Sequence, residues 1–247
     1  MKIAVISGGS SGIGEACIKK FNANGWFIFN LDIKNNSKFA NLGNYWWLDT
    51  NVAEEVEIIQ AINKIITAKN RIDVVIVSAG KHLSASIENT SNEQLLDLVN
   101  LNLFGSYWLI KHSIPIMKSQ HMGNIITIGS DQSSIAKANS VVYGMTKAAL
   151  AHLTKSIALD YAKYNIRANC IGVGTVDTPL YRAAIEQYST SSGIPVQQIE
   201  QEEAQEQPIG QIGKPEEVAE LAYFLAQDNV AYITGALIPM DGGYTIR

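Results

Sequence analysis

Short apolar runs alternate with longer amphipathic segments along the whole chain. Strand-like runs occur at seven places, which are Lys2–Ile6, Trp26–Leu31, Tyr45–Leu48, Asp73–Val77, Asn124–Ile128, Ile166–Ile171 and Ala236–Pro239. Several are apolar throughout, which is typical of parallel strands covered on both faces. Between them, the pattern predicts helices at Gly12–Asn24, Ala53–Lys69, Asn92–Lys118, Tyr143–Tyr164 and Pro215–Gln227. This alternation predicts an α/β fold, with a seven-stranded, doubly wound parallel sheet of the Rossmann type in a single domain over residues 1–247.

One segment interrupts the alternation. Tyr181–Gln211 is rich in Gln, Glu and Ser and contains the helix-breaking sequence Gly193–Pro195. It is too long for an ordinary connection, so it is either a lid over a site or a disordered insert. The apolar residues Ile185, Val196 and Ile199 could anchor one or two short helices, which favours a substrate lid at 181–211.

Composition and charge narrow the class of protein. The 247 residues are 47% hydrophobic and 17% charged, which excludes a disordered or low-complexity chain. A net charge of −4 gives no indication of a basic surface that would bind nucleic acid or an anionic membrane. Cys17 and Cys170 form no disulfide or zinc pattern. No apolar stretch approaches the roughly 18 residues of a membrane span. We therefore expect a cytoplasmic protein with no metal, nucleic acid or membrane partner.

A glycine-rich turn, Ser7–Gly14, lies between the first strand and the first helix. Backbone N–H groups in such a turn can approach a phosphate closely. A nucleoside triphosphatase loop needs Lys after its last glycine, and Glu15 occupies that position. Gly8–Gly12 also fits the G-x-S-x-G nucleophile elbow, with Ser10 as the nucleophile of a serine hydrolase. The last histidine is His152 and no Gly-rich oxyanion segment is evident, so the hydrolase is a minor alternative.

The remaining interpretation of the turn is a dinucleotide site. Gly8, Gly12 and Gly14 are spaced G-x-x-x-G-x-G rather than G-x-G-x-x-G, so the common fingerprint is not met. Asp32, however, closes the second strand 18 positions after Gly14. A carboxylate there can accept hydrogen bonds from both adenosine-ribose hydroxyls and would repel a 2′-phosphate. Together, the turn and the carboxylate favour a dinucleotide.

A second group of polar residues lies in the middle of the chain. Tyr143 and Lys147 are four residues apart and share one face of a predicted helix. Ser130 precedes Tyr143 by thirteen positions and follows the strand Asn124–Ile128, at the carboxyl end where ligands of α/β proteins bind.

In these features the chain resembles the compact form of the short-chain dehydrogenase/reductase family, over essentially its whole length. The motifs that carry the resemblance, in order, are Ser7–Gly14, Asp32, Asp49, Val77–Gly80, Asn102–Gly105, Ser130, Tyr143, Lys147, Gly174–Pro179 and Asp241–Gly243. The resemblance implies an NAD(P)-dependent oxidoreductase acting on CH–OH groups. It also implies a homo-oligomer, a tetramer or a dimer, built on the two longest predicted helices.

The resemblance implies four catalytic residues. Tyr143 would exchange a proton with the substrate oxygen, and Ser130 would hold that oxygen by a hydrogen bond. Lys147 would bind the nicotinamide ribose and, with the positive nicotinamide, lower the pKa of Tyr143. A free phenol has a pKa of about 10, so work near neutrality needs a shift of roughly three units. Asn102 would position a water that links the lysine to solvent.

Cofactor contacts follow from the same resemblance. They are Gly8, Gly12, Ile13, Gly14, Asp32, Asp49, Thr50, Ala79, Gly80, Tyr143, Lys147, Val176 and Thr178. Asp32 with no basic residue at position 33 favours NAD over NADP, although Lys34 lies close.

The substrate must be inferred from the loops. Asp131, Gln132, Ser133 and Ser134 follow Ser130 where relatives often carry small apolar residues. Buried polar groups beside a site need polar partners, so we expect a small polar substrate, either a sugar derivative or a hydroxy acid. The expected substrate contacts are Ser130, Gln132, Tyr143 and His82. The sequence thus predicts an NAD-dependent enzyme that interconverts a secondary alcohol and a ketone. A non-catalytic NAD-binding sensor or scaffold is an alternative. Such a protein would be expected to lack Tyr143, Lys147 or Ser130, and all three are present.

Overall fold

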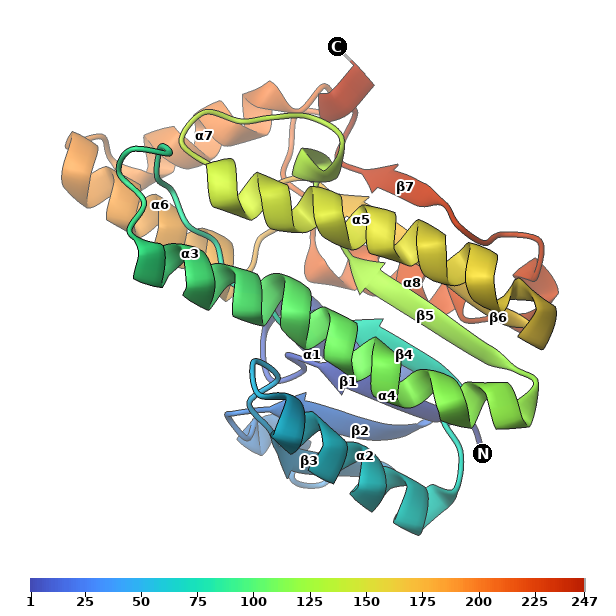
Figure 1. Ribbon diagram of the computed structural model, residues 1–247. Coiled ribbons are helices and arrows are strands. Elements are labelled where there is room, and N and C mark those ends of the chain that lie inside the picture. The colour runs from blue at the N-terminus through green and yellow to red at the C-terminus, as the bar shows by residue number, and fades with distance from the viewer. Residues whose placement is uncertain (247) are drawn as a thin grey trace.

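Seven parallel strands form one sheet at the centre of the protein. The computed structural model describes residues 1–246 (Figure 1). The strands are β1 Ile3–Ser7, β2 Phe27–Asp32, β3 Tyr45–Asp49, β4 Val74–Val77, β5 Gly123–Ile128, β6 Ile166–Val173 and β7 Leu237–Met240. Their order across the sheet is β3-β2-β1-β4-β5-β6-β7. The predicted doubly wound parallel sheet is confirmed, with strand ends shifted by one or two residues.

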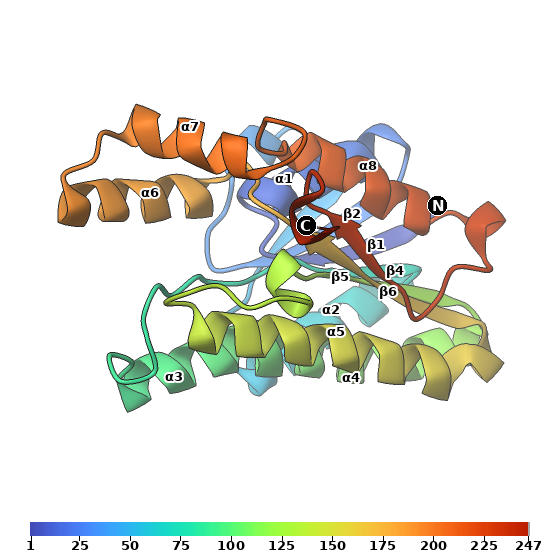
Figure 2. The same ribbon diagram turned by 90° about the horizontal axis from the view of Figure 1, so that it is seen from above.

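Helices cover both faces of the sheet (Figure 2). They are α1 Gly12–Ala23, α2 Glu55–Lys69, α3 Asn92–Val99, α4 Gly105–Gln120, α5 Val141–Tyr161, α6 Pro179–Ser192, α7 Val196–Glu206 and α8 Pro215–Leu225. Neighbouring residues of a strand point to opposite faces. Ile3 and Val5 therefore pack in the core with α2, α4 and α5, whereas Ala4 and Ile6 pack with α1 and α8. No helix of residues 1–246 is long and apolar enough to cross a membrane.

The direction of winding reverses beside β1. The chain places β2 and β3 on one side of β1, and β4 to β7 on the other. The connections that follow β1 and β4 therefore run in opposite directions across the sheet. They separate at the carboxyl ends of these strands. The turn after β1 and the loops after β4 and β5 therefore meet at one edge of the sheet.

The predicted helix Asn92–Lys118 is divided in the structure. The predicted capping box, Ser91 with Gln94, begins α3, and a π-helical turn over Asn100–Phe104 separates α3 from α4. A Cβ at Gly105 would lie 2.6 Å from the carbonyl oxygen of Val52, so this point of the helix touches backbone closely. Single π-turns of this kind are frequent at functional sites.

Two helices occupy the segment 181–211. α6 ends at Gly193, whose φ is 75°, and α7 follows Pro195. Ile185 and Ile199, two of the predicted anchors, are buried. α6 and α7 lie side by side (Figures 1 and 2). The structure therefore forms two helices in this segment.

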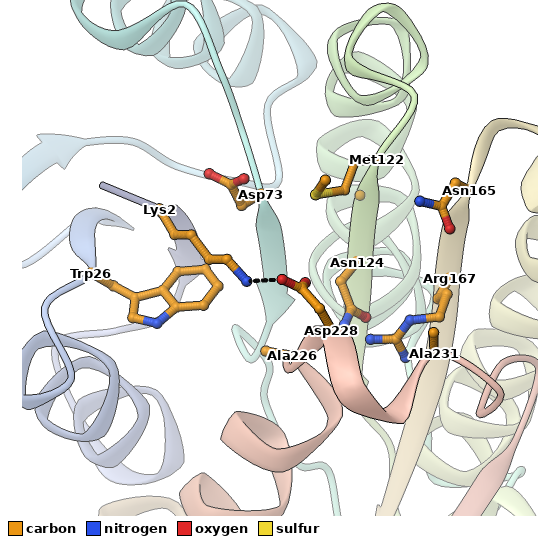
Figure 3. A pocket seen from close by; sticks show the side chains of 11 residues that line it. Lys2, Trp26, Asp73, Met122, Asn124, Asn165, Arg167, Ala226, Asp228 and Ala231 are labelled. Atoms are coloured by element: carbon orange, nitrogen blue, oxygen red, sulfur yellow. Dashed lines mark hydrogen bonds and ion pairs between the residues drawn. The ribbon is translucent and has the colours of Figure 1, made fainter.

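A pocket opens at the opposite, amino edge of the sheet (Figure 3). Its buried polar side chains serve the end of α8. Asn124 Nδ2 donates to the Leu225 carbonyl at 2.5 Å, and the Arg167 guanidinium donates to the same carbonyl at 2.6 Å and to that of Gln227 at 3.2 Å. The last carbonyls of a helix have no partner within it, so these bonds satisfy the end of α8.

Candidate active site

Three side chains converge where β5 ends and α5 begins. Lys147 is buried, and its Nζ donates to the Ile128 carbonyl at 2.8 Å. Ser130 stands two residues beyond this carbonyl, and its hydroxyl interacts with the phenol of Tyr143. Lys147 Nζ lies 5.6 Å from the centre of the Tyr143 ring. β5 and the first turns of α5 thus bring together the residues that the sequence pattern places in the catalytic group.

Asn102 approaches the same site from the π-helical turn. Its Oδ1 accepts from the Lys81 N–H at 2.9 Å, and its Nδ2 donates to the Lys81 carbonyl at 2.9 Å and to Thr146 Oγ1 at 3.3 Å. A Cβ at Gly80 would lie 3.2 Å from Asn102 Oδ1 and 3.9 Å from Lys147 Nζ. The buried amide therefore fixes the loop after β4 against α5.

Burial controls the protonation of the two central groups. It raises the pKa of Tyr143 to about 12, an effect that Ser130 reduces and the Asp131 carboxylate increases. It lowers the pKa of Lys147 to about 8. In both cases the cause is desolvation, which disfavours the charged form of a buried group.

Two of the expected substrate contacts, His82 and Gln132, lie next to Tyr143 and the first turn of α5. The His82 ring meets the Tyr143 ring edge-on, with 4.8 Å between centroids. Burial lowers the pKa of His82, and the charge of Lys137 lowers it further. Gln132 is buried against the first turn of α5, where its Oε1 lies 3.1 Å from the position of a Cβ on Gly144. That Oε1 has no hydrogen-bond partner among the described residues.

The glycine turn requires residues without side chains. Gly8 has a φ of 67°, and a Cβ on it would lie 2.7 Å from Ala79 Cα. A Cβ on Gly14 would lie 2.2 Å from the Gly8 carbonyl oxygen. Ser11 precedes α1 in an extended conformation, and its side chain makes no capping bond. The first N–H groups of α1, which include that of Ile13, therefore have no side-chain cap.

Asp32 ends β2 directly beside this turn. Its Oδ2 accepts from the Ser10 N–H at 3.0 Å and its Oδ1 from the Lys34 N–H at 3.0 Å. β2 and β3 pair Asp32 with Asp49, which is exposed, and Thr50 next to it is buried. Three of the expected cofactor contacts, Asp32, Asp49 and Thr50, thus lie within one corner of the carboxyl edge.

Val176 and Thr178 approach the turn from the segment after β6. Val176 pairs with Gly213 in an isolated β-bridge, and Thr178 caps α6 by accepting from the Tyr181 N–H at 3.2 Å. A Cβ on Gly12 would lie 3.3 Å from Thr178 Cγ2. The entrance to α6 is therefore next to the start of α1.

Sequence reasoning missed Asn30. It is fully buried in the middle of β2, where its Oδ1 accepts from the Gly9 N–H at 3.1 Å. Its Nδ2 donates to Ser10 Oγ at 3.0 Å and to the Tyr45 hydroxyl at 2.9 Å. A single polar residue inside the apolar run Phe27–Leu31 was the signal that could have revealed it.

Ser10 has a different environment from a hydrolase nucleophile. Its hydroxyl donates to the Lys34 carbonyl and accepts from Asn30, and its N–H donates to Asp32. These bonds make Ser10 part of the turn. Within residues 1–246, no three His, Cys, Asp or Glu side chains are arranged to hold a metal ion.

Comparisons with known proteins agree with this geometry. Residues 8–245 match the family model described as enoyl-(acyl carrier protein) reductase. The chain is 37% identical to dehydrogenase/reductase SDR family member 6 of Aquarana catesbeiana, over 99% of this chain and 98% of that protein. It is 32% identical to L-fucose dehydrogenase of Mus musculus, over 98% and 88% of the two chains.

A solved structure supports the same relationship. The ligand-free aldohexose dehydrogenase of Thermoplasma acidophilum matches with a TM-score of 0.93 and 34% identity, over 100% of this chain and 94% of that one. These matches extend over the whole fold, including the carboxyl edge where Ser130, Tyr143 and Lys147 meet. The chain therefore belongs to the short-chain dehydrogenase/reductase family and is an oxidoreductase that acts on CH–OH groups with a nicotinamide coenzyme.

Proposed function

We propose that the protein oxidises a CH–OH group of a neutral sugar, with NAD⁺ as the hydride acceptor and Tyr143 as the general base. The observation that carries this proposal is the convergence of Ser130, Tyr143 and Lys147 at the end of β5. In the reverse direction the same phenol donates the proton. Asn102 contributes to the catalytic group by holding the loop after β4, through its two hydrogen bonds to the backbone of Lys81.

The residues of the turn fit a dinucleotide. The first N–H groups of α1 lack a side-chain cap, and the helix N-terminus attracts the negative charge of a pyrophosphate. Glycines at 8, 12 and 14 keep the approach free of side chains. Asp32 stands at the end of β2, where a carboxylate accepts hydrogen bonds from ribose hydroxyls. Asp49 and Thr50 would lie against the adenine, Ala79 and Gly80 against the ribose, and Val176 and Thr178 against the carboxamide.

The proton moves through this chain's own groups. NAD⁺ held by these residues would supply the hydride acceptor for the carbinol carbon and a positive charge near the phenol. Tyr143 takes the alcohol proton, and this requires the phenolate, which its buried surroundings disfavour. Lys147, anchored to the Ile128 carbonyl, stabilises the phenolate as it forms. Ser130 holds the substrate oxygen and stabilises the charge that develops on it.

The charge of the segment after β6 favours a neutral sugar over a hydroxy acid. Residues 177–206 contain six acidic side chains and one basic side chain, Arg182. Arg182 is bound to Asp177 at 2.7 Å and also pairs with Glu200. Lys81 and Lys137, at the other side of the site, pair with Asp97 and Asp131. An anionic substrate would therefore meet acidic groups and cations that are already paired.

We propose that α6 and α7 form the lid over this substrate. Thr178, beside the glycine turn, begins α6, and Thr175 donates to Glu203 of α7 at 3.1 Å. The Tyr181 hydroxyl is buried without a partner among the described residues, as is Gln132 Oε1. Buried polar atoms are almost always hydrogen-bonded, so a hydroxyl-rich substrate is a suitable partner for both.

Exposed apolar side chains support a homo-oligomer, a tetramer or a dimer. On α4 and α5, Tyr107, Met145 and Leu159 are exposed, and Leu159 retains 81% of its accessible surface. Phe104, in the π-helical turn that leads into α4, is exposed as well. The two helices lie on the same face of the sheet (Figure 2).

A matched pair of substrates tests the neutral-sugar proposal. D-glucose and D-gluconate share most of their hydroxyl groups but differ in charge. We expect kcat/KM with NAD⁺ to be at least about tenfold higher for the best neutral aldose, with L-fucose and D-glucose both assayed, than for gluconate. NADH fluorescence measures the rate. Faster oxidation of gluconate would contradict the neutral-sugar assignment and leave the oxidoreductase class intact.

Tyr143→Phe tests the base. Without a phenol to take the proton, we expect kcat to fall by about a thousandfold while the affinity for NADH changes by less than about twofold. Tyr161→Phe, at the far end of α5, should retain wild-type kcat. In the wild type, kcat for alcohol oxidation should rise with pH as the phenol deprotonates, and kcat for ketone reduction should fall. Substantial turnover by Tyr143→Phe with the same pH dependence would exclude Tyr143 as the base.

Asp32→Ala tests the coenzyme preference. The wild type should use NAD⁺ with kcat/KM more than about tenfold above that for NADP⁺, because the carboxylate repels a 2′-phosphate. Removal of the carboxylate should reduce this ratio by about tenfold, chiefly through KM. Steady-state kinetics with both coenzymes measure it, and Asp160→Ala on the exposed face of α5 is the control. A wild type that prefers NADP⁺ would refute the role of Asp32.

Asn30→Ala tests the support of the glycine turn. The change leaves the Gly9 N–H and Ser10 without their buried partner, so we expect the Kd for NADH to rise by about tenfold. Tyr45→Phe removes a single hydrogen bond and should raise the Kd less. Fluorescence titration gives the affinity, and thermal unfolding verifies that each variant is folded. Equal affinity of Asn30→Ala and the wild type would show that the turn does not depend on this amide.

A further inference from the structure

The hydroxyl of Ser130 already has a strong acceptor in the protein. Its Oγ donates to Asp131 Oδ1 at 2.7 Å and accepts from the Gln132 N–H at 3.1 Å. The same N–H donates to Asp131 Oδ1 at 2.7 Å. An ionised carboxylate only accepts hydrogen bonds, so the Ser130 proton points to Asp131 and a lone pair of Oγ remains for other donors. The orientation of Ser130 therefore depends on its neighbour.

Asp131 is itself buried and has a cation beside it. Its side chain is 4% exposed, and its Oδ2 lies 2.7 Å from Lys137 Nζ. The lysine rests on the Tyr244 ring, 4.2 Å from its centre, which joins the loop after β5 to the last turn of the chain. Removal of one partner of a buried ion pair leaves an uncompensated charge. Here that charge would lie next to Ser130.

We propose that Asp131 and Lys137 form a positioning pair for the active site. Asp131 fixes the position of Ser130 Oγ, from which the hydroxyl proton turns to the substrate oxygen, and Lys137 balances the charge of Asp131 beside Tyr143. This inference rests on the proposed function of Ser130 and Tyr143. It assigns a role to two residues that touch neither reacting atom. Asp131 acts through Ser130, and Lys137 acts through Asp131.

The charged groups around the phenol come from four segments. Lys147 belongs to the same helix, and Asp131 follows β5. Lys137 lies in the loop before α5, and His82 meets the ring from the loop after β4. The negative charge of Asp131 disfavours the phenolate, whereas the positive charge of Lys137 offsets it. The two members of the pair thus influence Tyr143 in opposite directions.

These opposite signs give a test that needs no substrate. The phenol of Tyr143 is titrated through its tyrosinate absorbance with NAD⁺ bound, each variant being compared with the same variant carrying Tyr143→Phe. Asp131→Asn removes the anion and should move the titration to lower pH by about one unit. Lys137→Met leaves the anion uncompensated and should move it to higher pH by a similar amount. The double variant should return close to the wild type.

Asp228→Asn is the matched control. Asp228 pairs with Lys2 at 2.8 Å at the opposite edge of the sheet, so its loss should leave the titration unchanged (Figure 3). The positioning of Ser130 is read from kcat with L-fucose and D-glucose. Asp131→Asn should lower kcat by about tenfold or more, with an unchanged KM for NAD⁺, because a neutral amide holds Ser130 Oγ less firmly in the position from which it donates to the substrate oxygen.

The outcomes separate this inference from the proposed function. Shifts of Tyr143 in the same direction for both single variants, or no shift in either, would overturn the positioning pair even if Tyr143→Phe is inactive. Full alcohol oxidation by Tyr143→Phe would instead refute the proposed function. Thermal unfolding verifies that each variant is folded. A single variant that does not fold is replaced by Asp131→Ser or Lys137→Gln, which remove the same charges and should give the same opposite shifts.

Discussion

The bond from Lys147 Nζ to the Ile128 carbonyl is the interaction on which the site depends. It joins the start of α5 to the carboxyl end of β5 and fixes the rotation of the helix about its axis. Tyr143, one turn earlier on α5, is thereby aimed at the residues that follow β5. The ammonium is buried, and no carboxylate of the described chain lies within ion-pair distance of it. Its charge is therefore not balanced by an ion pair, and the Tyr143 ring lies 5.6 Å from Nζ.

Burial of these groups has two effects. It makes each unshared charge costly, which raises the pKa of Tyr143 and lowers that of Lys147. It also strengthens every interaction that does form, because the local dielectric constant is low. A bound cationic ring, a reacting alcohol and the Asp131 charge would therefore all change the phenol more than they would in water.

The sheet and the grouping of three polar residues at its edge could be predicted from the sequence because both depend on local sequence pattern. Apolar runs gave the sheet, and the spacing of Ser130, Tyr143 and Lys147 placed them at one edge. Other features depend on contacts between distant residues. The buried amide of Asn30 finds its partners in two other segments, and the pairing of Asp131 with Lys137 depends on the path of a loop. The division of the helix after Val99 depends on packing against Val52, and no periodicity reveals that.

The π-helical turn at Asn100–Phe104 has a consequence for how this site tolerates changes in chain length. A residue advances about 100° around an α-helix, so the extra residue of a π-turn rotates everything before it relative to everything after. Deletion of one residue here would give a regular helix with good backbone hydrogen bonds and an intact composition. It would nevertheless turn α3 away from its neighbours and withdraw Asn102 from Lys81. At this point, the position of the buried Asn102 amide is set by the number of residues in the turn rather than by their chemistry.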